Sequence, residues 1–507
     1  METRLVKINN MEDCKKDMEE AGELIKAGEL VAFPTETVYG LGGNGLLPDA
    51  AKKIYAAKGR PSDNPLILHV CDMQMVESLV KEIPDNARRA MEHFWPGPMT
   101  VILQKADQVP DCVTGGLDTV AIRMPDHPVA LELIRRSGVP IAAPSANTSG
   151  RPSPTLAEHV AEDLGGKIDM ILDGGAVEIG LESTILDMTV TPPMILRPGA
   201  ITAEMFEEVI GKVDVDETLL VAESEKAPKA PGMKYRHYAP KAKLMIVEGD
   251  LREEIFAIRQ LAYKAYKEGR KVGVIATTET LPFYKYGVVK NIGTRENEKT
   301  IARNLYRVLR EFDEEDVEEI YSESFAAQGI GKAIMNRLEK AAGHTRLSAA
   351  EIAKRQKYRR IIFISGTDSA RAPMAAEMLR HEDLAQEYVI DSRGLVVLFP
   401  EPANQKAEAI MKSAQMTLEN HVSRQLEPET LVEDTLVLTI EEAEKNKILS
   451  EYGTKANVYT LNEFVGSDGE IPNPYGKPLT AYGECYEILR ELIKELAEKL
   501  NYIAEEE

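Results

Sequence analysis

Leu30-Val-Ala-Phe-Pro-Thr-Glu-Thr-Val-Tyr-Gly-Leu-Gly-Gly-Asn-Gly45 begins with four apolar residues and continues into a run rich in proline, threonine and glycine. A short apolar run bounded by such residues predicts a buried strand, Leu30–Phe33, followed by a loop. The glycines of Gly40-x-Gly42-x-x-Gly45 match a dinucleotide-binding fingerprint, which requires a tight turn directly after the strand. Six residues separate the strand from the first glycine, so we interpret the glycines as loop residues.

Short apolar runs between proline- and glycine-rich loops continue through residues 1–208. Further strands are predicted at Met99–Leu103, Ile141–Ala143 and Met170–Leu172, and a helix with proline in its first turn at Pro48–Ala57. Strands that alternate with loops and helices predict an α/β sheet that encloses a groove.

The strand–helix pattern restarts at residues 241 and 358, which predicts three α/β domains joined by two linkers. The expected segments are a first domain at 1–208, a linker or lid at 209–240, a small domain at 241–346, a second linker at 347–357, and a third domain at 358–507. The residues Tyr235–Tyr238 of the first linker are all aromatic or cationic, whereas a spacer favours small or acidic residues. Because functional side chains concentrate on loops, we expect this linker to act in function; the alternative is a stiff spacer.

The protein has 507 residues, of which 43% are hydrophobic, and this is enough apolar material for cores of ordinary size. No stretch approaches the ~20 apolar residues of a membrane span, and the polar start Met1–Lys16 lacks the pattern of a signal peptide. The four cysteines are far apart and form no CxxC pair, which excludes a disulfide framework and a zinc ribbon. We therefore expect a cytoplasmic protein with reduced thiols and no membrane partner.

The formal net charge of -22 argues against a protein that mainly grips a nucleic-acid backbone. This charge is uneven, because the segment from Tyr358 to the end has 15 Lys and Arg against 28 Asp and Glu. More than half of the negative excess thus belongs to the last third, which leaves room for a basic groove in the first two thirds.

Several polar loops are candidate ligand contacts. The loop Lys58-Gly-Arg-Pro-Ser-Asp-Asn-Pro-Leu66 holds two cations in a stiff backbone, which suits a triphosphate, although a helix end also favours basic residues. The small hydroxyl and amide side chains of Ala142–Pro152, and those of Glu182–Thr184, suit a phosphate or a ribose but are equally ordinary turn residues. None of these motifs decides the function alone.

The combination of motifs is more specific. Six of them occur in order: Pro34-Thr-Glu-Thr-Val-Tyr-Gly-Leu41, Lys58-x-Arg-Pro with Asn64-Pro-Leu66, Trp95-Pro-Gly-Pro98, Arg123-x-Pro125, Ser145-x-Asn147, and Glu182-Ser-Thr184. This string resembles the YrdC/TsaC family of threonylcarbamoyl-AMP synthases. The linker motif Pro231–Pro240 and the stretch Gly331–Leu338 resemble the longer, two-domain branch of that family, so the resemblance covers about residues 5–345.

The resemblance implies an α/β fold, with a YrdC-like domain that carries a ligand groove and a small Rossmann-like domain. It also implies that L-threonine, bicarbonate and ATP are converted to threonylcarbamoyl-AMP and pyrophosphate, and that a downstream transferase modifies the tRNA adenosine beside the anticodon. This chemistry needs no protein nucleophile; it needs anions brought together with their repulsion neutralised, and a carbamate shielded from water. The sequence has no Ser-His-Asp or Cys-His arrangement, which fits this requirement.

Matched residue by residue, the resemblance assigns catalytic roles to Lys58, Arg60 and Arg123, and implies Mg²⁺ as the companion of ATP. Tyr238 is expected to help close the groove as part of a lid. The implied threonine contacts are Thr37, His69, Arg123, Ala143 and Ser183, and the implied ATP contacts are Arg60, Asn64, Thr119, Ser145, Ser153, Arg197 and Arg236.

The segment Arg360–Met374 resembles the phosphate loop of low-molecular-weight protein tyrosine phosphatases, which have a flavodoxin-like α/β fold. Ser365 stands where that family has its nucleophilic cysteine, and Asn473 stands where it has its general acid aspartate. A serine without an adjacent base does not form an alkoxide at neutral pH, and an amide cannot protonate a leaving group. Arg371 could still hold an anion weakly, but we expect an inactive domain that mediates protein contacts.

Two alternatives from other functional classes stay open at this point. One is a double-stranded-RNA-binding module that uses the groove of the first domain, which the acidic total charge disfavours. The other is a working phosphatase or arsenate reductase with a regulatory front part, which Ser365 and Asn473 disfavour.

Overall fold

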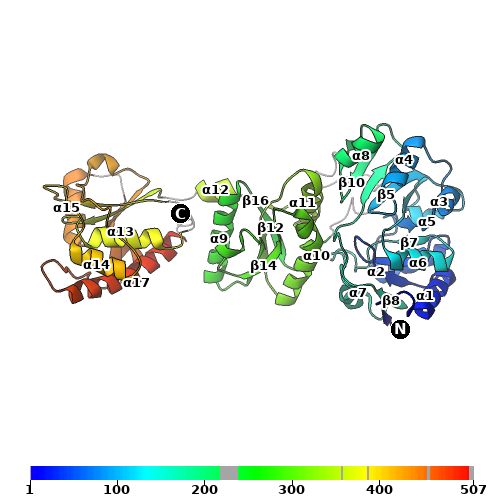
Figure 1. Cartoon of the computed structure of the whole chain (residues 1–507), viewed down its shortest axis with the longest axis horizontal. Helices are drawn as coiled ribbons and strands as arrows, with labels where there is room; N and C mark the ends of the chain where they lie inside the picture. The colour runs from blue at the N-terminus through cyan, green and yellow to red at the C-terminus, as the bar shows by residue number, and fades with distance from the viewer. Residues whose placement is uncertain (1, 217–237, 355–357, 385–387, 454–456, 502–507) are drawn as a thin grey trace. The chain divides into compact units, whose positions relative to one another are not determined.

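The computed structural model describes residues 2–216, 238–354, 358–384, 388–453 and 457–501 (Figure 1). Contacts along the chain group these residues into two compact units. One comprises Met1–Leu251 with Gly269–Leu347, and the other comprises Arg252–Glu268 with Ser348–Glu507. Sheets flanked by helices make up both units, so the α/β fold class predicted from the sequence is confirmed.

The largest sheet lies in the first unit and has the strand order β1-β8-β2-β3-β7-β4-β6-β5-β9-β10-β11. Its strands are β1 Arg4–Lys7, β2 Val31–Phe33, β3 Gly40–Asn44, β4 Ile67–His69, β5 Met99–Gln104, β6 Thr119–Arg123, β7 Ile141–Ala143, β8 Met170–Asp173, β9 Thr184–Asp187, β10 Met194–Arg197 and β11 Asp214–Val215. The helices of this part are α1 Lys15–Ala27, α2 Pro48–Lys58, α3 Met73–Leu79, α4 Asp85–Phe94, α5 Asp111–Thr114, α6 Pro128–Ser137, α7 Ala157–Leu164 and α8 Ala203–Ile210. The four strands and the helix predicted in this region are confirmed as β2, β5, β7, β8 and α2.

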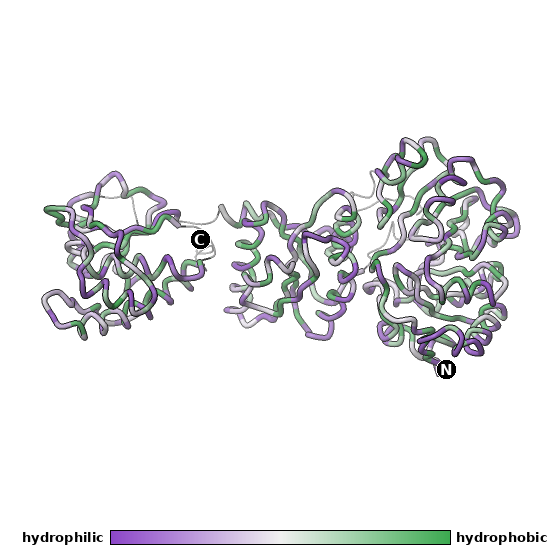
Figure 2. Tube along the Cα trace, viewed as in Figure 1, coloured by the Kyte–Doolittle hydropathy of each residue, from purple (hydrophilic) through white to green (hydrophobic). Residues whose placement is uncertain are grey.

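Helices cover both faces of this sheet. Val31 and Phe33 of β2 belong to one buried cluster together with residues of α1 and α6, whereas Ala32 belongs to a second cluster that includes Ile54 of α2. Successive side chains of a strand point to opposite faces. The uninterrupted apolar run that predicted this strand therefore reflects burial on both sides. Figure 2 shows hydrophobic stretches of this kind along the chain trace.

The glycine-rich stretch after β2 is a strand, so our interpretation of Gly40–Gly45 as a loop is wrong. It pairs antiparallel with β2, with Gly42 opposite Val31, and its other edge pairs with β7. A Cβ atom on Gly42 would lie 2.8 Å from Ile141 Cγ2 and 2.8 Å from the ring of Phe33. The glycine is therefore required by close packing within the sheet rather than by a turn.

The small domain of the same unit is built on a five-stranded sheet of order β14-β13-β15-β12-β16. The pairs β13–β14, β13–β15 and β12–β15 are parallel, as expected for the Rossmann-like domain. Its elements in this unit are β12 Lys243–Glu248, β13 Val272–Thr277, η2 Leu281–Phe283, β14 Val288–Gly293, α10 Glu298–Glu315, β15 Glu319–Ser322, α11 Gly329–Ala341 and β16 Arg346–Ser348. The helix α9 Leu251–Lys267 follows β12 in sequence but is grouped with the second unit.

The second unit contains a parallel four-stranded sheet of order β18-β17-β19-β20. Its elements are α12 Ala349–Lys354, β17 Arg360–Ser365, α13 Arg371–His381, β18 Val389–Gly394, α14 Gln405–Ser413, η3 Pro428–Thr430, β19 Thr435–Thr439, α15 Glu442–Tyr452, β20 Asn457–Thr460, α16 Leu461–Val465 and α17 Leu479–Leu500. The long helix α17 covers the sheet through a buried row that includes Leu489 and Ile493. Within the described residues, none of the helices combines the length and the apolarity that a membrane span requires.

Candidate functional site

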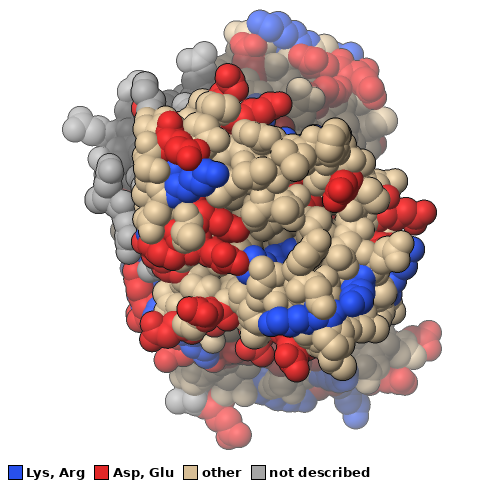
Figure 3. Space-filling view, turned by 90° about the vertical axis from the view of Figure 1, so that its left-hand side faces the viewer, with Lys and Arg blue, Asp and Glu red and all other residues tan. Residues whose placement is uncertain are grey.

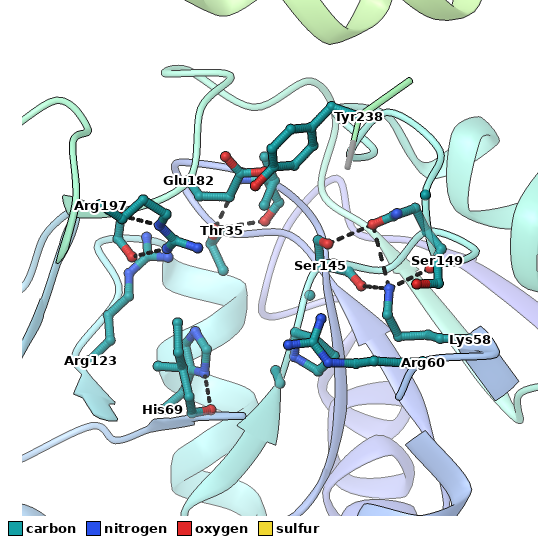
Figure 4. A pocket seen from close by; sticks show the side chains of 18 residues that line it. Thr35, Lys58, Arg60, His69, Arg123, Ser145, Ser149, Glu182, Arg197 and Tyr238 are labelled. Atoms are coloured by element: carbon teal, nitrogen blue, oxygen red, sulfur yellow. Dashed lines mark hydrogen bonds between the residues drawn. The ribbon is translucent and has the colours of Figure 1, made fainter. Parts of the chain in front are cut away.

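A polar pocket lies in the first domain, and many of the residues predicted for ligand binding line it (Figure 4). They come from strands and loops that are distant in sequence but converge because β3, β7, β4 and β6 are neighbours in the sheet. The predicted residues that line the pocket are Lys58, Arg60, His69, Arg123, Ala143, Ser145, Ser183, Arg197 and Tyr238.

Lys58 and Arg60 enter the pocket from the end of α2. Gly59 between them has φ +63° and ends the helix, so that the two cations stand on either side of a left-handed residue. The buried Lys58 Nζ donates to the backbone carbonyls of Ser145 and Asn147. Burial lowers the pKa of Lys58, the charge of Arg60 lowers it further, and burial lowers the pKa of Arg60 to about 10. Buried positive charge of this kind favours an anionic ligand.

His69 and Arg123 lie side by side, because β4 and β6 are parallel and these two residues are register partners. Arg123 Nη1 donates to Thr37 Oγ1 at 2.9 Å, and its Nη2 lies 2.7 Å from a carboxylate oxygen of Glu36. His69 Nδ1 lies 3.2 Å from the carbonyl oxygen of Ile67, which can only accept, so Nδ1 carries the proton and Nε2 is an acceptor. Burial lowers the pKa of His69 to about 3 and Arg123 adds to the effect, so this imidazole is neutral.

Arg197 at the end of β10 is held against Ser183. Its Nε donates to the Ser183 carbonyl at 3.0 Å and its Nη2 donates to Ser183 Oγ at 3.1 Å. The Ser183 hydroxyl also contacts Thr100 Oγ1 at 2.7 Å. Burial lowers the pKa of Arg197 to about 10, which still leaves the guanidinium charged near neutral pH.

Glu182 is the carboxylate that lines the pocket, and it is ionised. It accepts hydrogen bonds from Ser153 Oγ at 2.7 Å, from Tyr306 OH at 2.9 Å and from Arg337 Nε at 2.9 Å. Burial alone would raise the pKa of Glu182, but the charges of Arg337 and Arg197 outweigh it and hold the pKa at about 2. The sequence analysis placed Glu182 in a polar motif but gave its carboxylate no contact of its own. It named Arg337 only within the family stretch Gly331–Leu338, without a role, and it missed Tyr306.

The remaining predicted residues have different places. Thr37 and Ser153 lie one hydrogen bond behind the pocket wall, on Arg123 and Glu182 respectively, and Asn64 accepts from Arg60 Nε through its backbone carbonyl at 3.3 Å. Thr119 starts β6, at the end of the strand opposite Arg123. Arg236 lies outside the described residues.

Tyr238, the residue predicted for the lid, is buried and lines the pocket. Its backbone has φ +66°, and its ring centroid lies 5.1 Å from that of Tyr306. Figure 4 shows it beside Glu182 at the upper edge of the pocket.

In the second unit, the loop between β17 and α13 runs from Ser365 to Arg371. Arg371 forms an ion pair with Glu441 and donates from Nη1 to the Ile471 carbonyl at 3.2 Å. Asp368 is fully buried, accepts from the Arg424 amide at 3.0 Å, and has its pKa raised by burial. The predicted general-acid position is occupied by the Asn473 amide, whose Oδ1 accepts from the Tyr475 amide at 3.1 Å.

Comparison with protein-family models divides the chain into three matched regions. Residues 23–199 match the family described as Telomere recombination, which includes the YrdC proteins. Residues 201–343 match the C-terminal domain of threonylcarbamoyl-AMP synthase, and residues 360–505 match the low molecular weight phosphotyrosine protein phosphatases.

Curated relatives and a solved structure agree with the first two regions. The chain is 53% identical over 325 residues to the threonylcarbamoyl-AMP synthase of Bacillus subtilis, which covers 64% of this chain and 92% of that protein. It is 50% identical over 324 residues to the synthase of Pyrococcus abyssi, which covers 64% of this chain and 93% of that protein. The solved structure of Pyrococcus abyssi Sua5 complexed with L-threonine is 47% identical, covers 69% of this chain and 99% of that chain, and superposes with a TM-score of 0.64.

The fold and the cationic pocket thus define the class, an enzyme of the nucleotidyltransferase type whose product is linked to AMP. More particularly, the chain belongs to the threonylcarbamoyl-AMP synthase family and has a phosphatase-like domain at its C-terminal end. The family resemblance stated from the sequence motifs is confirmed.

Proposed function

We propose that the pocket joins L-threonine, bicarbonate and ATP to form threonylcarbamoyl-AMP with release of pyrophosphate. The amine of threonine forms a bond to the carbon of bicarbonate with loss of water, and an oxygen of the resulting carbamate then attacks the α-phosphorus of ATP. The observation that carries this proposal is the convergence of four cationic side chains, Lys58, Arg60, Arg123 and Arg197, on one pocket. Bicarbonate, ATP and the carboxylate of threonine carry negative charge and repel one another, and fixed positive charge in a partly dry site offsets that repulsion.

Threonine binds, in this proposal, on the side of the pocket where Figure 4 shows Arg123 and His69. Arg123 neutralises the carboxylate and the carbamate, and the neutral His69 offers an Nε2 acceptor to a hydroxyl or amine proton of the substrate. Thr37 orients Arg123 through its hydroxyl. Ala143 and Ser183 are the remaining proposed threonine contacts. Ala143 acts through its backbone or by packing.

ATP binds on the side that carries Lys58 and Arg60, with the hydroxyl of Ser145 beside them. An Arg fork and a Lys point charge suit phosphate oxygens. Thr119 lies four residues before Arg123 on β6, which is about 13 Å at the rise of a strand, so it suits a distal part of an extended nucleotide. Asn64, Ser153, Arg197 and Arg236 are the other proposed contacts.

Mg²⁺ is proposed to accompany ATP, where it would neutralise phosphate charge. Within the described residues, no cluster of three or more Asp, Glu, His or Cys side chains is arranged to hold a metal. Glu182 of the pocket already accepts from Ser153, Tyr306 and Arg337. The residues that line the pocket therefore fit a cation whose ligands are mainly phosphate oxygens and water.

Tyr238 is proposed to act in a lid that keeps water from the carbamate, and its burial against the pocket supports this role. The product then passes to a transferase that modifies tRNA, so tRNA is an indirect partner. We propose that the protein acts in the cytoplasm together with this transferase. For the phosphatase-like domain we propose a role in protein contacts.

Pyrophosphate release with ATP and bicarbonate, with and without L-threonine, tests the proposed activity. The wild-type protein is expected to release pyrophosphate only when threonine is present. The Lys58→Ala and Arg60→Ala variants are expected to lose at least about 100-fold in kcat/KM, because each removes a charge that faces the phosphates. Lys52→Ala is the control, since Lys52 is an exposed residue of the same helix. Wild-type protein that leaves ATP intact would contradict the proposal.

A further inference from the structure

Two side chains of the small domain reach the pocket of the first domain. Tyr306 of α10 and Arg337 of α11 are fully buried, and both donate to Glu182, which lines the pocket. Tyr306 OH lies 3.0 and 2.9 Å from the two carboxylate oxygens, and Arg337 Nε lies 2.9 Å from one of them. The carboxylate is therefore fixed from the side of the small domain.

Glu182 passes this restraint to groups proposed to touch ATP and threonine. Its Oε1 accepts from the hydroxyl of Ser153, and it directly precedes Ser183, to which Arg197 is bonded twice. Because its oxygens already accept from three donors, Glu182 is unsuited to act as a base. Its role is to hold its neighbours in place.

A second contact from α10 holds the pocket wall that contains Ser149 and Gly150. Arg310 of α10 donates from Nη2 to Asp163 Oδ2 at 2.9 Å and to the Pro152 carbonyl at 2.6 Å. Asp163 Oδ2 also accepts from the Thr148 amide at 3.0 Å, and the next two residues, Ser149 and Gly150, line the pocket. The small domain thus restrains the loop that carries the proposed phosphate contacts as well as Glu182.

Apolar packing continues between these polar contacts. Val38 and Tyr238 line the pocket, and both belong to the buried cluster that forms the core of the small domain. The pocket wall and this core are therefore one packed structure, in which a displacement of α10 or α11 changes the position of pocket residues.

We propose that Arg337 and Tyr306 are positioning residues of the synthase reaction, and that the small domain completes the active site through Glu182. The proposal rests on the proposed function. It predicts that loss of either donor displaces Glu182 and, with it, Ser153 and Ser183. The displacement should lower kcat/KM for ATP. A purely structural role predicts lower stability with unchanged kinetics in the protein that stays folded.

The experiment compares Tyr306→Phe, Arg337→Lys and Arg337→Met with wild type in the full-length protein. Tyr306→Phe removes one hydroxyl and keeps the ring that packs against Tyr238, so it is the variant that best keeps the fold. We expect kcat/KM for ATP to fall about tenfold in Tyr306→Phe and about 100-fold in Arg337→Met, with a smaller loss in Arg337→Lys. Arg307→Gln is the matched control on α10, because among the described residues Arg307 pairs with Glu311 and Asn304 of its own helix, and it should stay within about twofold of wild type.

Calorimetric titration of ATP and a double variant separate positioning from stability. ATP affinity should fall in Tyr306→Phe at a temperature well below the unfolding midpoint. In a Glu182→Gln background, Arg337→Met should lower kcat/KM for ATP by less than about threefold more, since the two substitutions act through the same side chain. Folded Tyr306→Phe and Arg337→Met variants with the kinetics of the Arg307→Gln control would overturn the proposal. Failure of wild type to release pyrophosphate would instead overturn the proposed function.

Discussion

His69 shows how the surroundings of one residue set its charge. It is buried next to the guanidinium of Arg123, and both burial and that charge oppose protonation, so its pKa falls to about 3. An exposed histidine has a pKa of about 6.5. In the folded protein His69 is thus an uncharged hydrogen-bonding group throughout the neutral range, which suits the proposed contact with threonine.

The depressed pKa of His69 predicts a pH-dependent stability. Between about pH 3 and pH 6.5 the unfolded chain binds a proton at this residue and the folded chain does not, so the stability rises with pH. One such proton contributes about 1.4 kcal/mol per pH unit. His69→Gln should therefore show a weaker dependence of the unfolding midpoint on pH between 4.5 and 6.5.

Fluorescence of Trp95 reports the unfolding midpoint of the first domain, which contains His69. Trp95 is the single tryptophan of the chain and is buried in that domain. His381→Gln serves as the control, since His381 is exposed in the second unit. Equal pH dependence in wild type and His69→Gln would contradict the assigned charge state.

At the same scale, the sequence predicted the cations of the pocket better than the residues that hold them. Lys58, Arg60 and Arg123 belong to compact local motifs, and all three line the pocket. Tyr306 and Arg337 are 124 and 155 residues from Glu182 in sequence. No local pattern couples positions so far apart, because their contact depends on how two domains pack.

Among the elements, β3 shows what hydrophobic pattern alone does not predict. Its sequence Gly40–Asn44 contains three glycines and has low strand propensity. It is nevertheless a central strand, because only glycine allows β2 and β7 to approach it closely. The apolar strands β2, β5, β7 and β8 were predictable from composition, whereas β3 depends on tertiary packing.

Gly42→Ala tests this explanation. The added Cβ would meet Ile141 of β7 and Phe33 of β2 at 2.8 Å, so the strands must move apart. We expect the free energy of unfolding of the first domain to fall by up to about 3 kcal/mol. Urea unfolding followed by Trp95 fluorescence provides the measurement.

Gly59→Ala is the comparison for this prediction. Gly59 has φ +63° and open space around its Cβ position, so alanine there should cost only the roughly 1 kcal/mol of a left-handed conformation. A Gly42→Ala variant as stable as wild type would show that the sheet has room for the methyl group.

The whole molecule combines an enzyme with a phosphatase-like domain in which Ser365 and Asn473 stand at the positions that the sequence resemblance gives to the nucleophile and the general acid. More than half of the net charge of -22 lies in the segment from Tyr358 onwards, and Figure 3 shows several groups of acidic side chains on the face that it displays. Such a charge disfavours phosphorylated partners at long range. The matched family and the replaced residues Ser365 and Asn473 together indicate a pseudophosphatase.

The phosphatase-like domain yields a prediction for the full chain. Wild-type protein should not hydrolyse p-nitrophenyl phosphate above background, because the Ser365 hydroxyl stays protonated and Asn473 cannot donate a proton. The double variant Ser365→Cys/Asn473→Asp should gain hydrolysis. A thiol at position 365 lies in the loop before the N-terminus of α13, and both this helix end and the charge of Arg371 lower the pKa of the thiol.

We expect the gain to be at least about 100-fold over wild type, the usual contribution of a positioned general acid. Ser365→Ala/Asn473→Asp is the control, because it restores the acid without a nucleophile and should stay at background. Glu441 already pairs with Arg371, so removing it by Glu441→Gln in the double variant should lower KM further. Hydrolysis by wild type at the rate of the double variant would show that the domain still works as a phosphatase. A double variant without activity would show that the loop from Ser365 to Arg371 no longer forms an oxyanion site.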